Sequence, residues 1–374
     1  MISRMGRAVE SVTVPAGYLA PKRVGAGLKV FHQAVEVCLW RLLFAITIAN
    51  HSHFIYNPGG WFRWRLDLSC QRLWAGDGLR NEEGSNEEKV VMKTQLDCIP
   101  CFISHVLNAV RMTTDDEQVH EKVLREAMCI GCKLDFLDSP PAMAQKIHYF
   151  IRKVTGVKDP YHEVKQKFNE FALGMYPELK ELIESSVDPF ETAVRLAIAG
   201  NIIDFGINSE VEQSKVEQTI AESLTEPLDM DALAKFHQAT GEAHDILYLG
   251  DNAGEIVFDK LLIERLPQGR ITFVVKGGPI LNDAMQEDAE MVGLTDIVNV
   301  VDNGSDAPGT ILADCSKAFV QRFERAELVI AKGQANYETL GEVDKKMFFL
   351  LRPKCDVLAE HLSREIGTLV LMRK

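Results

Sequence analysis

The chain carries two successive patterns of hydrophobic and polar residues. From residue 93 to residue 245, apolar residues recur at three- and four-residue spacing, which predicts a series of amphipathic helices. From residue 245 onward, short β-rich runs alternate with polar or glycine turns and further helical stretches: "DILYLG", "RITFVVKG", "DIVNVVDNG" and "AELVIAKG". The closing "CDVLAEHLSREIGTLVLMRK" predicts one more helix and a last strand. The sequence therefore predicts an α/β fold, a mainly helical N-terminal part followed by a parallel-type sheet covered by helices.

The first 91 residues differ from the rest of the chain. They hold all four tryptophans and carry 11 Lys and Arg against 8 Asp and Glu, whereas residues 92–374 carry 30 against 46. The "NEEK" shortly before Met92 can be encoded by a purine-rich run resembling a bacterial ribosome-binding site. We interpret residues 1–91 as translated upstream sequence or a disordered extension, with an amphipathic membrane anchor as the alternative. Residues 92–244 are predicted to form a helical subdomain and residues 245–374 an α/β subdomain.

The composition is that of a globular protein, with 46% hydrophobic and 25% charged residues. A formal net charge of −13 argues against a broad nucleic-acid-binding surface, so we expect no nucleic-acid partner. The most apolar stretch, residues 37–49, is too short for a membrane span and contains Arg41, so we expect no stable membrane association. Eight cysteines in 374 residues do not resemble a secreted disulfide scaffold, which favours the cytoplasm.

Polar side chains gather at the turns that follow the four predicted strands. In chain order, the turns carry Asp251, Asn252 and Glu255; Lys276, Asn282 and Asp283; Asp302, Asn303 and Asp306; and Lys332, Gln334, Asn336 and Glu338. Each residue alone is more often a helix cap or a solvent-facing side chain than a ligand, but parallel strands bring their carboxyl ends to one rim. Carboxylate and amide oxygens suit Mg²⁺ or Mn²⁺, and a lysine beside such an ion would neutralise a phosphoryl group. Residues 245–374 are therefore predicted to be a metal-binding subdomain.

Four of these motifs together carry a family resemblance. "GDNAGE", "KGGPILNDA", "KGQANYETL" and the earlier "AGNIIDFG" resemble the metal-dependent damage-control phosphatases, also known as domain of unknown function 89. "MKTQLDCIPCF" resembles the start of the prokaryotic, Cys-containing branch, and the resemblance covers residues 92 to about 370. It implies a divalent metal at the strand ends and hydrolysis of small phosphorylated metabolites, such as sugar phosphates or damaged cofactor precursors.

The resemblance also implies roles for individual residues. The metal ligands carry over to Asp251, Asn252 and Asp283, with Mn²⁺, Mg²⁺, Co²⁺ or Ni²⁺ as the ion. The phosphate-contacting lysine carries over to Lys332, which also makes it a candidate catalytic residue beside the three ligands. The further candidate substrate-binding residues are Lys276, Asn201, Asp204, Glu255 and Asn336. No general base is assigned, and the candidates are Asp204, Glu255 and Glu338.

Two C-x-x-C pairs lie in the helical part: Cys98 with Cys101, and Cys129 with Cys132. Together they could form a four-thiolate structural zinc site. The alternative places Cys129 and Cys132 in a core at the end of a helix. No strand precedes "CIPC", which argues against a thioredoxin-like redox site.

Three rival functions stay open. "ILYLGDNAGE" also resembles the strand and turn that bind S-adenosylmethionine in a carboxyl methyltransferase, although "RITFVVKGG" lacks an acidic ribose-binding residue after its strand. A haloacid-dehalogenase-type phosphatase needs a second aspartate two residues after its nucleophile, where this chain has Ala253. The third rival is a non-catalytic metal-binding module.

Overall fold

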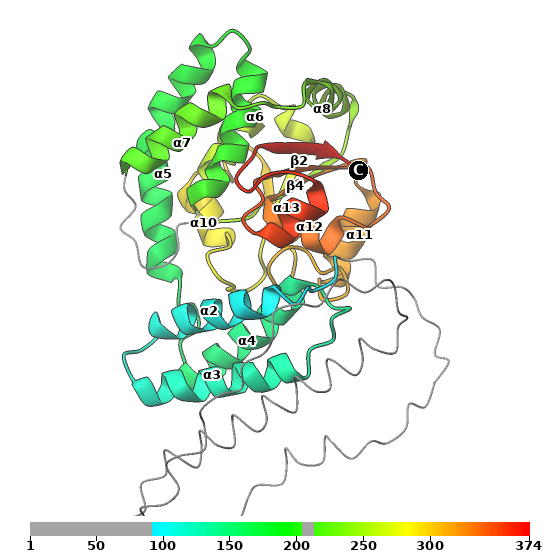
Figure 1. Ribbon diagram of the computed structural model, residues 1–374. Helices are drawn as coiled ribbons and strands as arrows, with labels where there is room; N and C mark the ends of the chain where they lie inside the picture. Colours follow the sequence, from blue (N-terminus) through cyan, green and yellow to red (C-terminus); the bar gives the residue numbers. More distant parts are fainter. Residues whose placement is uncertain (1–91, 204–212) are drawn as a thin grey trace, which may run out of the picture. The chain divides into compact units, whose positions relative to one another are not determined.

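The computed structural model describes residues 92–203 and 213–374 (Figure 1). The predicted extension, residues 1–91, lies outside the described residues, and so does Asp204. The described chain begins with α2 (Cys98–Arg111), α3 (Glu117–Cys132), α4 (Pro140–Thr155), α5 (His162–Ser185), α6 (Pro189–Ala199), α7 (Gln213–Thr225) and α8 (Met230–Glu242). None of the helices in these two ranges has the length and apolar content needed to cross a membrane.

Strands and helices then alternate along the chain. The elements are β1 (Ile246–Leu249), α9 (Glu255–Ile263), β2 (Ile271–Val275), α10 (Gln286–Met291), β3 (Asn299–Asp302), α11 (Lys317–Arg325), β4 (Leu328–Lys332), α12 (Gly333–Leu340), β5 (Met347–Leu351), α13 (Asp356–Leu362) and β6 (Val370–Arg373). The α/β fold class predicted from the sequence is therefore confirmed.

The six strands form one sheet in the order β3-β2-β1-β4-β5-β6. All neighbouring pairs are parallel except β5 and β6, which are antiparallel. The four predicted runs became β1 to β4, and the predicted last strand became β6. The "MFFLL" run of β5 is a strand that the sequence reading missed, and the antiparallel direction of β6 was not foreseen.

Both faces of the sheet are buried, because its strands alternate side chains between two cores. Tyr248 and Phe273 face the core shared with α5, α6, α8 and α9. Leu247, Leu249 and Val329 face the opposite core, which α11, α12 and α13 complete. The sheet is thus a layer between two layers of helices (Figure 1).

The helices before the sheet divide between two cores. A separate hydrophobic cluster joins α2, α3 and α4, with Val106, Val123 and Ile147 at its centre. Figure 1 shows these three helices lying together, on the other side of the sheet region from α5 to α8. Since α5, α6 and α8 share a core with the sheet, a helical subdomain spanning all of residues 92–244 stays a prediction.

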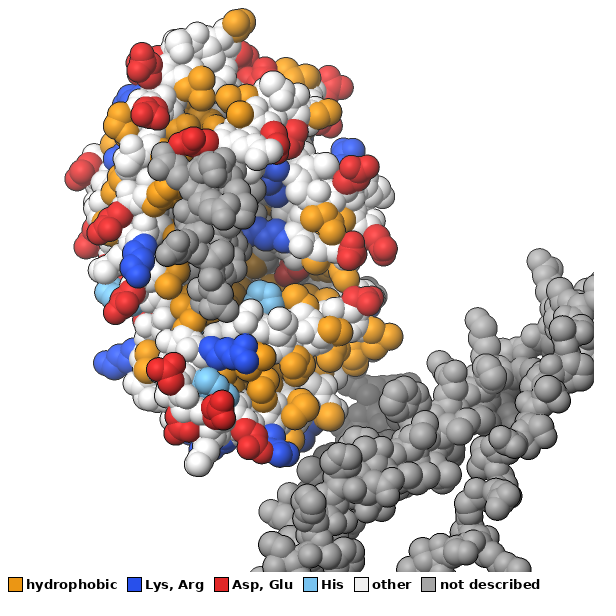
Figure 2. All heavy atoms as spheres, turned by 60° about the vertical axis from the view of Figure 1, so that its left-hand side comes forward, with side chains coloured by type: hydrophobic (Ala, Val, Ile, Leu, Met, Phe, Trp, Pro, Cys, Tyr) orange, Lys and Arg blue, Asp and Glu red, His pale blue; other side chains and the backbone are white. Residues whose placement is uncertain are grey.

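The surface is mixed in charge. On the face shown in Figure 2, acidic and basic side chains are interspersed, and hydrophobic side chains gather toward the lower end. Exposed large hydrophobic residues in and beside the α2–α4 group are Leu96, Met128, Phe136, Leu137 and Tyr149.

Candidate active site

The site lies where the strand order reverses. β1 and β4 are neighbours, and the chain runs outward from β1 to β2 and β3 on one side and from β4 to β5 on the other. The loops after β1 and β4 therefore run in opposite directions at the carboxyl edge, which is the usual ligand position in open parallel sheets. The turn after β1 holds Asp251 and Asn252, and β4 ends at Lys332.

Backbone hydrogen bonds bring Asp283 beside Asp251 and Asn252. Asn252 and Asp283 form an isolated antiparallel bridge. The N–H of Ala284 donates to the carbonyl of Asp251 over 2.8 Å, and the N–H of Ala253 donates to the carbonyl of Asn282 over 2.8 Å. All three predicted ligand residues are buried. The turn after β1 and the loop after β2 are therefore fixed to each other at the positions predicted to hold a metal.

Gly333, the first residue of α12, closes the other side of Asp251. Its φ is +77°, and a β-carbon there would lie 1.8 Å from Oδ2 of Asp251. Only glycine leaves room for the Asp251 carboxylate at this point, and it adopts this left-handed conformation without strain. The carboxylate therefore lies at the N-terminus of α12, where the helix dipole favours a negative charge.

Lys332 is fully buried among acidic side chains. Its Nζ donates to Oε1 of Glu255 and Oδ1 of Asp259 over 2.6 Å each, and to the carbonyl of Ala197 over 2.8 Å. Burial lowers the pKa of Lys332, but Asp259 and Glu255 raise it by more, so the ammonium stays charged. All three N–H donors are thus engaged within the protein. A direct contact between Lys332 and a phosphate would have to replace one of these bonds and stays a prediction.

Asn201 links the two acidic residues on the β1 side. Its Nδ2 donates to Oδ2 of Asp251 over 3.1 Å and to Oε2 of Glu255 over 2.8 Å. Its Oδ1 is buried and has no hydrogen-bond partner among the described residues. An unpartnered buried amide oxygen at this position is an acceptor that could coordinate a cation or accept a hydrogen bond from a substrate hydroxyl.

Lys276 and Asn336 also lie at the site. Nζ of Lys276 is 3.3 Å from Oδ2 of Asp283 and donates to the carbonyl of Gly309. Nδ2 of Asn336 donates to the carbonyls of Lys332 and Gly250, over 2.8 and 3.3 Å. Lys276 therefore offsets the charge of Asp283, while Asn336 fixes the ends of β1 and β4.

The buried charges at the site do not balance. Four buried carboxylates, Asp251, Glu255, Asp259 and Asp283, face two buried ammonium groups, Lys276 and Lys332, which leaves two negative charges. Burial raises the pKa of Asp251 well above its usual value, and the charges of Glu255 and Asp283 raise it further. A divalent cation would supply the two missing positive charges, and the carboxylate and amide oxygens are the donors that Mg²⁺ and Mn²⁺ prefer. The residues present therefore fit such an ion.

A tighter group of ligand-type side chains lies elsewhere. In residues 92–203 and 213–374, the group whose ligand atoms all lie within 4.8 Å of one another is Asp159, His162 and Glu287. His162 and Glu287 are exposed, and Oδ2 of Asp159 already pairs with Nζ of Lys165 over 2.8 Å. This group lies at the starts of α5 and α10, and its negative charge is already partly offset by Lys165.

We call the four buried carboxylates Asp251, Glu255, Asp259 and Asp283 the acidic group. The polar residues at the end of β3 and in the loop after it lie outside this group. Asp302 is exposed and accepts a hydrogen bond from the N–H of Gly304. Oδ1 of Asn303 accepts from the N–H of Ser305 over 2.9 Å. Asp306 pairs with Arg152 of α4. The expected convergence of strand ends therefore holds for β1, β2 and β4.

Two residues that interact with the site were missed from the sequence. Lys354, in the loop between β5 and α13, is exposed, and its charge lowers the pKa of Asp251. Asn169 of α5 accepts from the N–H of Gly254 over 2.6 Å and donates to Asp288 over 2.8 Å. The available signal for Lys354 was a basic turn, Arg352-Pro353-Lys354, after an apolar run, whereas Asn169 lies in a long amphipathic helix without a distinguishing local pattern.

The four cysteines of the two C-x-x-C pairs are free thiols. They do not form a group with all ligand atoms within 4.8 Å in the described structure. Cys129 and Cys132 are exposed, so the alternative that buried them in a core is wrong. The shared four-thiolate zinc site stays a prediction.

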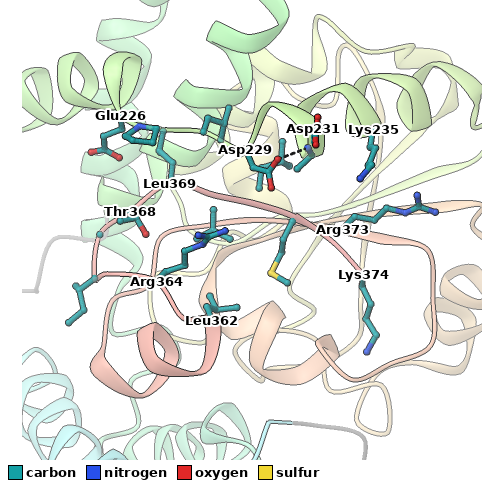
Figure 3. Close-up of a pocket in the computed structure, with 18 residues that line it drawn as sticks. Glu226, Asp229, Asp231, Lys235, Leu362, Arg364, Thr368, Leu369, Arg373 and Lys374 are labelled. Atoms are coloured by element: carbon teal, nitrogen blue, oxygen red, sulfur yellow. Dashed lines mark hydrogen bonds between the residues drawn. The ribbon is translucent and has the colours of Figure 1, made fainter.

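A cavity of about 1170 Å³ lies away from these residues, between α8 and β6 (Figure 3). Acidic Asp229 and Asp231 line its upper side, and basic Arg364, Arg373 and Lys374 line its lower side. None of the predicted catalytic or substrate-binding residues lines it.

Comparison with known proteins places this geometry in a family. The family described as "damage-control phosphatase ARMT1-like domain" matches residues 94–370. A damage-control phosphatase of Pyrococcus horikoshii is 34% identical over 287 residues, covering 75% of this chain and 98% of the relative. A damage-control phosphatase of Archaeoglobus fulgidus is 33% identical over 286 residues, with 75% and 98% covered. An uncharacterized protein of Methanocaldococcus jannaschii is 35% identical over 294 residues, with 76% and 96% covered.

A solved structure agrees with the sequence comparisons. The crystal structure of a DUF89 family protein from Pyrococcus horikoshii superposes with a TM-score of 0.67 at 31% identity, covering 75% of this chain and 99% of that one. The residues that the family matches, 94–370, contain every described element from α2 to α13 and all the residues of the acidic group. The chain belongs to the damage-control phosphatase ARMT1-like domain family.

Proposed function

We propose that this protein is a metal-dependent phosphatase that hydrolyses small phosphorylated metabolites. The observation that carries the proposal is the acidic group at the carboxyl edge of β1 and β4, where four buried carboxylates face two ammonium groups. The names of two relatives, both damage-control phosphatases, support the reaction class.

Asp251, Asn252 and Asp283 would hold the metal. When bound, a divalent ion supplies Lewis-acid polarisation of phosphoryl oxygens and lowers the pKa of water. The bridge between Asn252 and Asp283 supports this assignment, because it fixes the two loops that carry the oxygen donors. A site held by backbone hydrogen bonds keeps its donors in place when the substrate arrives.

Two lysines neutralise buried carboxylates, and a third is proposed to bind the substrate phosphate. Lys332 holds Glu255 and Asp259 in place from beneath the site, and Lys276 neutralises Asp283. Lys354 is exposed in the loop between β5 and α13, and its charge lowers the pKa of Asp251. It is therefore suited to attract and orient the phosphate of an incoming substrate.

The substrate class is a small phosphate ester, such as a sugar phosphate or a damaged cofactor precursor. The site residues are buried beneath the strand ends, which favours a compact phosphorylated group over a macromolecule. The six cysteines of the described residues are all free, which supports a reducing location such as the cytoplasm.

A phosphate-release screen tests the proposal. The full chain is assayed against a panel of small phosphate esters with Mg²⁺, Mn²⁺, Co²⁺ and Ni²⁺ added separately. We expect phosphate release that a chelator abolishes and that metal restores. Tight binding of S-adenosylmethionine without phosphate release would favour the methyltransferase. Metal binding without either activity would favour a non-catalytic module.

A further inference from the structure

Three cysteines and one buried carboxyl group interact electrostatically outside the acidic site. Cys98 and Cys101 occupy the first turn of α2, and Cys355 directly precedes α13. Glu338 lies on α12, and Gln334 of the same helix connects it to Cys355. Nε2 of Gln334 donates to Oε1 of Glu338 over 2.8 Å and to Sγ of Cys355 over 3.3 Å.

The segment that precedes α2 is hydrogen-bonded to Glu338. The N–H of Met92 donates to the carbonyl of Glu338 over 2.9 Å, and Met92 is buried in the core that Cys355 also contacts. Burial raises the pKa of the Cys98 and Cys101 thiols, and the negative charges of Glu338 and Cys355 raise both further. The C-x-x-C pair therefore lies within electrostatic range of both groups.

Glu338 is buried without a compensating positive charge. Its exposed fraction is 6%, and within the described residues no lysine, arginine or histidine forms an ion pair with it. Burial raises its pKa to about 7, even though the hydrogen bond from Gln334 lowers it. A buried carboxylate that lacks a cation is unfavourable. Three thiolates beside it would be more unfavourable still unless a cation joins them.

We propose that Cys98, Cys101, Cys355 and Glu338 bind one zinc-type cation. Zinc takes thiolate sulfur and carboxylate oxygen in four-coordinate sites. Both C-x-x-C cysteines lie in the first turn of α2, and a bound cation would stabilise their thiolate forms. This ligand set replaces the second C-x-x-C pair, Cys129 and Cys132, with residues from α12 and the loop after β5.

Side chains would have to rotate for all four ligand atoms to reach one cation. The four ligand atoms do not all lie within 4.8 Å of one another in the described structure. Cys101 is exposed, so it can change χ1 rotamer without displacing a packed neighbour, whereas Cys98 is half-buried and packs against the α2–α4 core. A bound cation would tie α2 to the loop that carries Lys354, the neighbour of Cys355.

The test uses the full chain, freed of metal and kept reduced under anaerobic conditions. Co²⁺ is titrated in, and absorption from thiolate-to-cobalt charge transfer is recorded. Only thiolate ligands give this band, so Co²⁺ at Asp251, Asn252 and Asp283 does not contribute to it. We expect one equivalent of Co²⁺ to produce the band and Zn²⁺ to displace it.

The variants separate the two possible thiol sets. Cys98→Ser and Cys355→Ser should weaken Co²⁺ binding by more than the roughly 10- to 100-fold lost when an outer partner of a metal ligand is removed. Cys129→Ser and Cys132→Ser, two exposed cysteines, are the matched controls and should leave the band unchanged. Glu338→Gln keeps the shape of the side chain, so it should weaken binding while the metal-free protein becomes no less stable.

Two results would overturn the inference. The first is the absence of a thiolate band in the wild-type protein at saturating Co²⁺. The second is a band that Cys129→Ser or Cys132→Ser removes and Cys355→Ser leaves intact, which would restore the pairing expected from the sequence. Thermal unfolding of each metal-free variant shows whether it is folded. A failed wild-type titration leaves the phosphatase proposal untouched, because that proposal uses no thiol.

Discussion

Gly333 lies against the carboxylate of Asp251 so closely that a β-carbon at residue 333 would come within 1.8 Å of Oδ2. Alanine there would also have to adopt a φ of +77°, which L-residues other than glycine disfavour. We expect Gly333→Ala to displace Asp251, to lose most phosphate-releasing activity, and to be less stable by about 1–3 kcal/mol. Phosphate release and urea unfolding measure the two effects.

Gly269→Ala is the control for this substitution. No heavy atom lies within 4 Å of a β-carbon at residue 269. Its stability should stay within about 0.5 kcal/mol of the wild type. Normal turnover in Gly333→Ala would show that the position of the Asp251 carboxylate is not needed for the reaction.

Lys332 should contribute to stability as well as to the site. Replacing it with methionine leaves Glu255 and Asp259 buried without their cation. We expect Lys332→Met to lower the free energy of unfolding by about 3–5 kcal/mol. Urea unfolding of Lys332→Met beside Lys122→Met, an exposed lysine, checks this. Equal stability of the two variants would contradict the buried ion pairs.

Asp251→Asn should stabilise the metal-free protein at neutral pH. Burial, Glu255 and Asp283 raise the pKa of Asp251 in the folded state. A raised carboxyl pKa means that this group favours folding at low pH and that its contribution is lost as pH rises toward the folded pKa. In the presence of a chelator, the variant should gain about 1 kcal/mol or more at pH 7.5 and little at pH 4.

A bound metal ion should make the wild type more stable than Asp251→Asn. Mn²⁺ at about 100 times its dissociation constant should add roughly 2.7 kcal/mol to the wild type and much less to Asp251→Asn. Urea unfolding across pH, with chelator and then with Mn²⁺, gives both comparisons. If Asp251→Asn is less stable than the wild type at every pH in the presence of chelator, the carboxylates of Glu255 and Asp283 do not destabilise the folded state by repelling Asp251.

His148 should make the protein sensitive to acid. Burial lowers its pKa to about 3, and Arg152 and His105 add to the effect. Since the unfolded chain takes up a proton near pH 6.5, stability is lost as pH falls from 6.5 toward 3. At pH 5 this group should cost about 2 kcal/mol. His148→Gln should show a correspondingly smaller loss between pH 7.5 and pH 5, and an equal loss would contradict the buried neutral ring.

The sequence predicted the strands that have a strong local signal. β1, β2 and β4 are continuous apolar runs followed by glycine or polar turns, and each was placed within a few residues. "MFFLL" of β5 is equally apolar, but a five-residue run without alternation does not separate strand from helix. The antiparallel direction of β6 depends on how the last loop returns, which no local pattern records.

The site was predictable where strand topology alone decides it. Asp251, Asn252 and Asp283 follow neighbouring strands, so parallel pairing brings them together. The partners of Lys332 were not predictable, because Asp259 lies on an otherwise apolar helix one turn after Glu255. The contact between Gly333 and Asp251 depends on how β4 lies beside β1, which the sequence alone does not specify.

The most direct test is phosphate release by the wild type, Asp251→Asn and Asp302→Asn on one responsive substrate at saturating metal. Asp302 is the last residue of β3 and is exposed, so it is a matched carboxylate at a strand end outside the acidic group. A phosphatase whose metal is held by Asp251 should lose more than about 100-fold in Asp251→Asn and less than about threefold in Asp302→Asn. Near-normal turnover of Asp251→Asn at saturating metal would contradict the proposed role of this site.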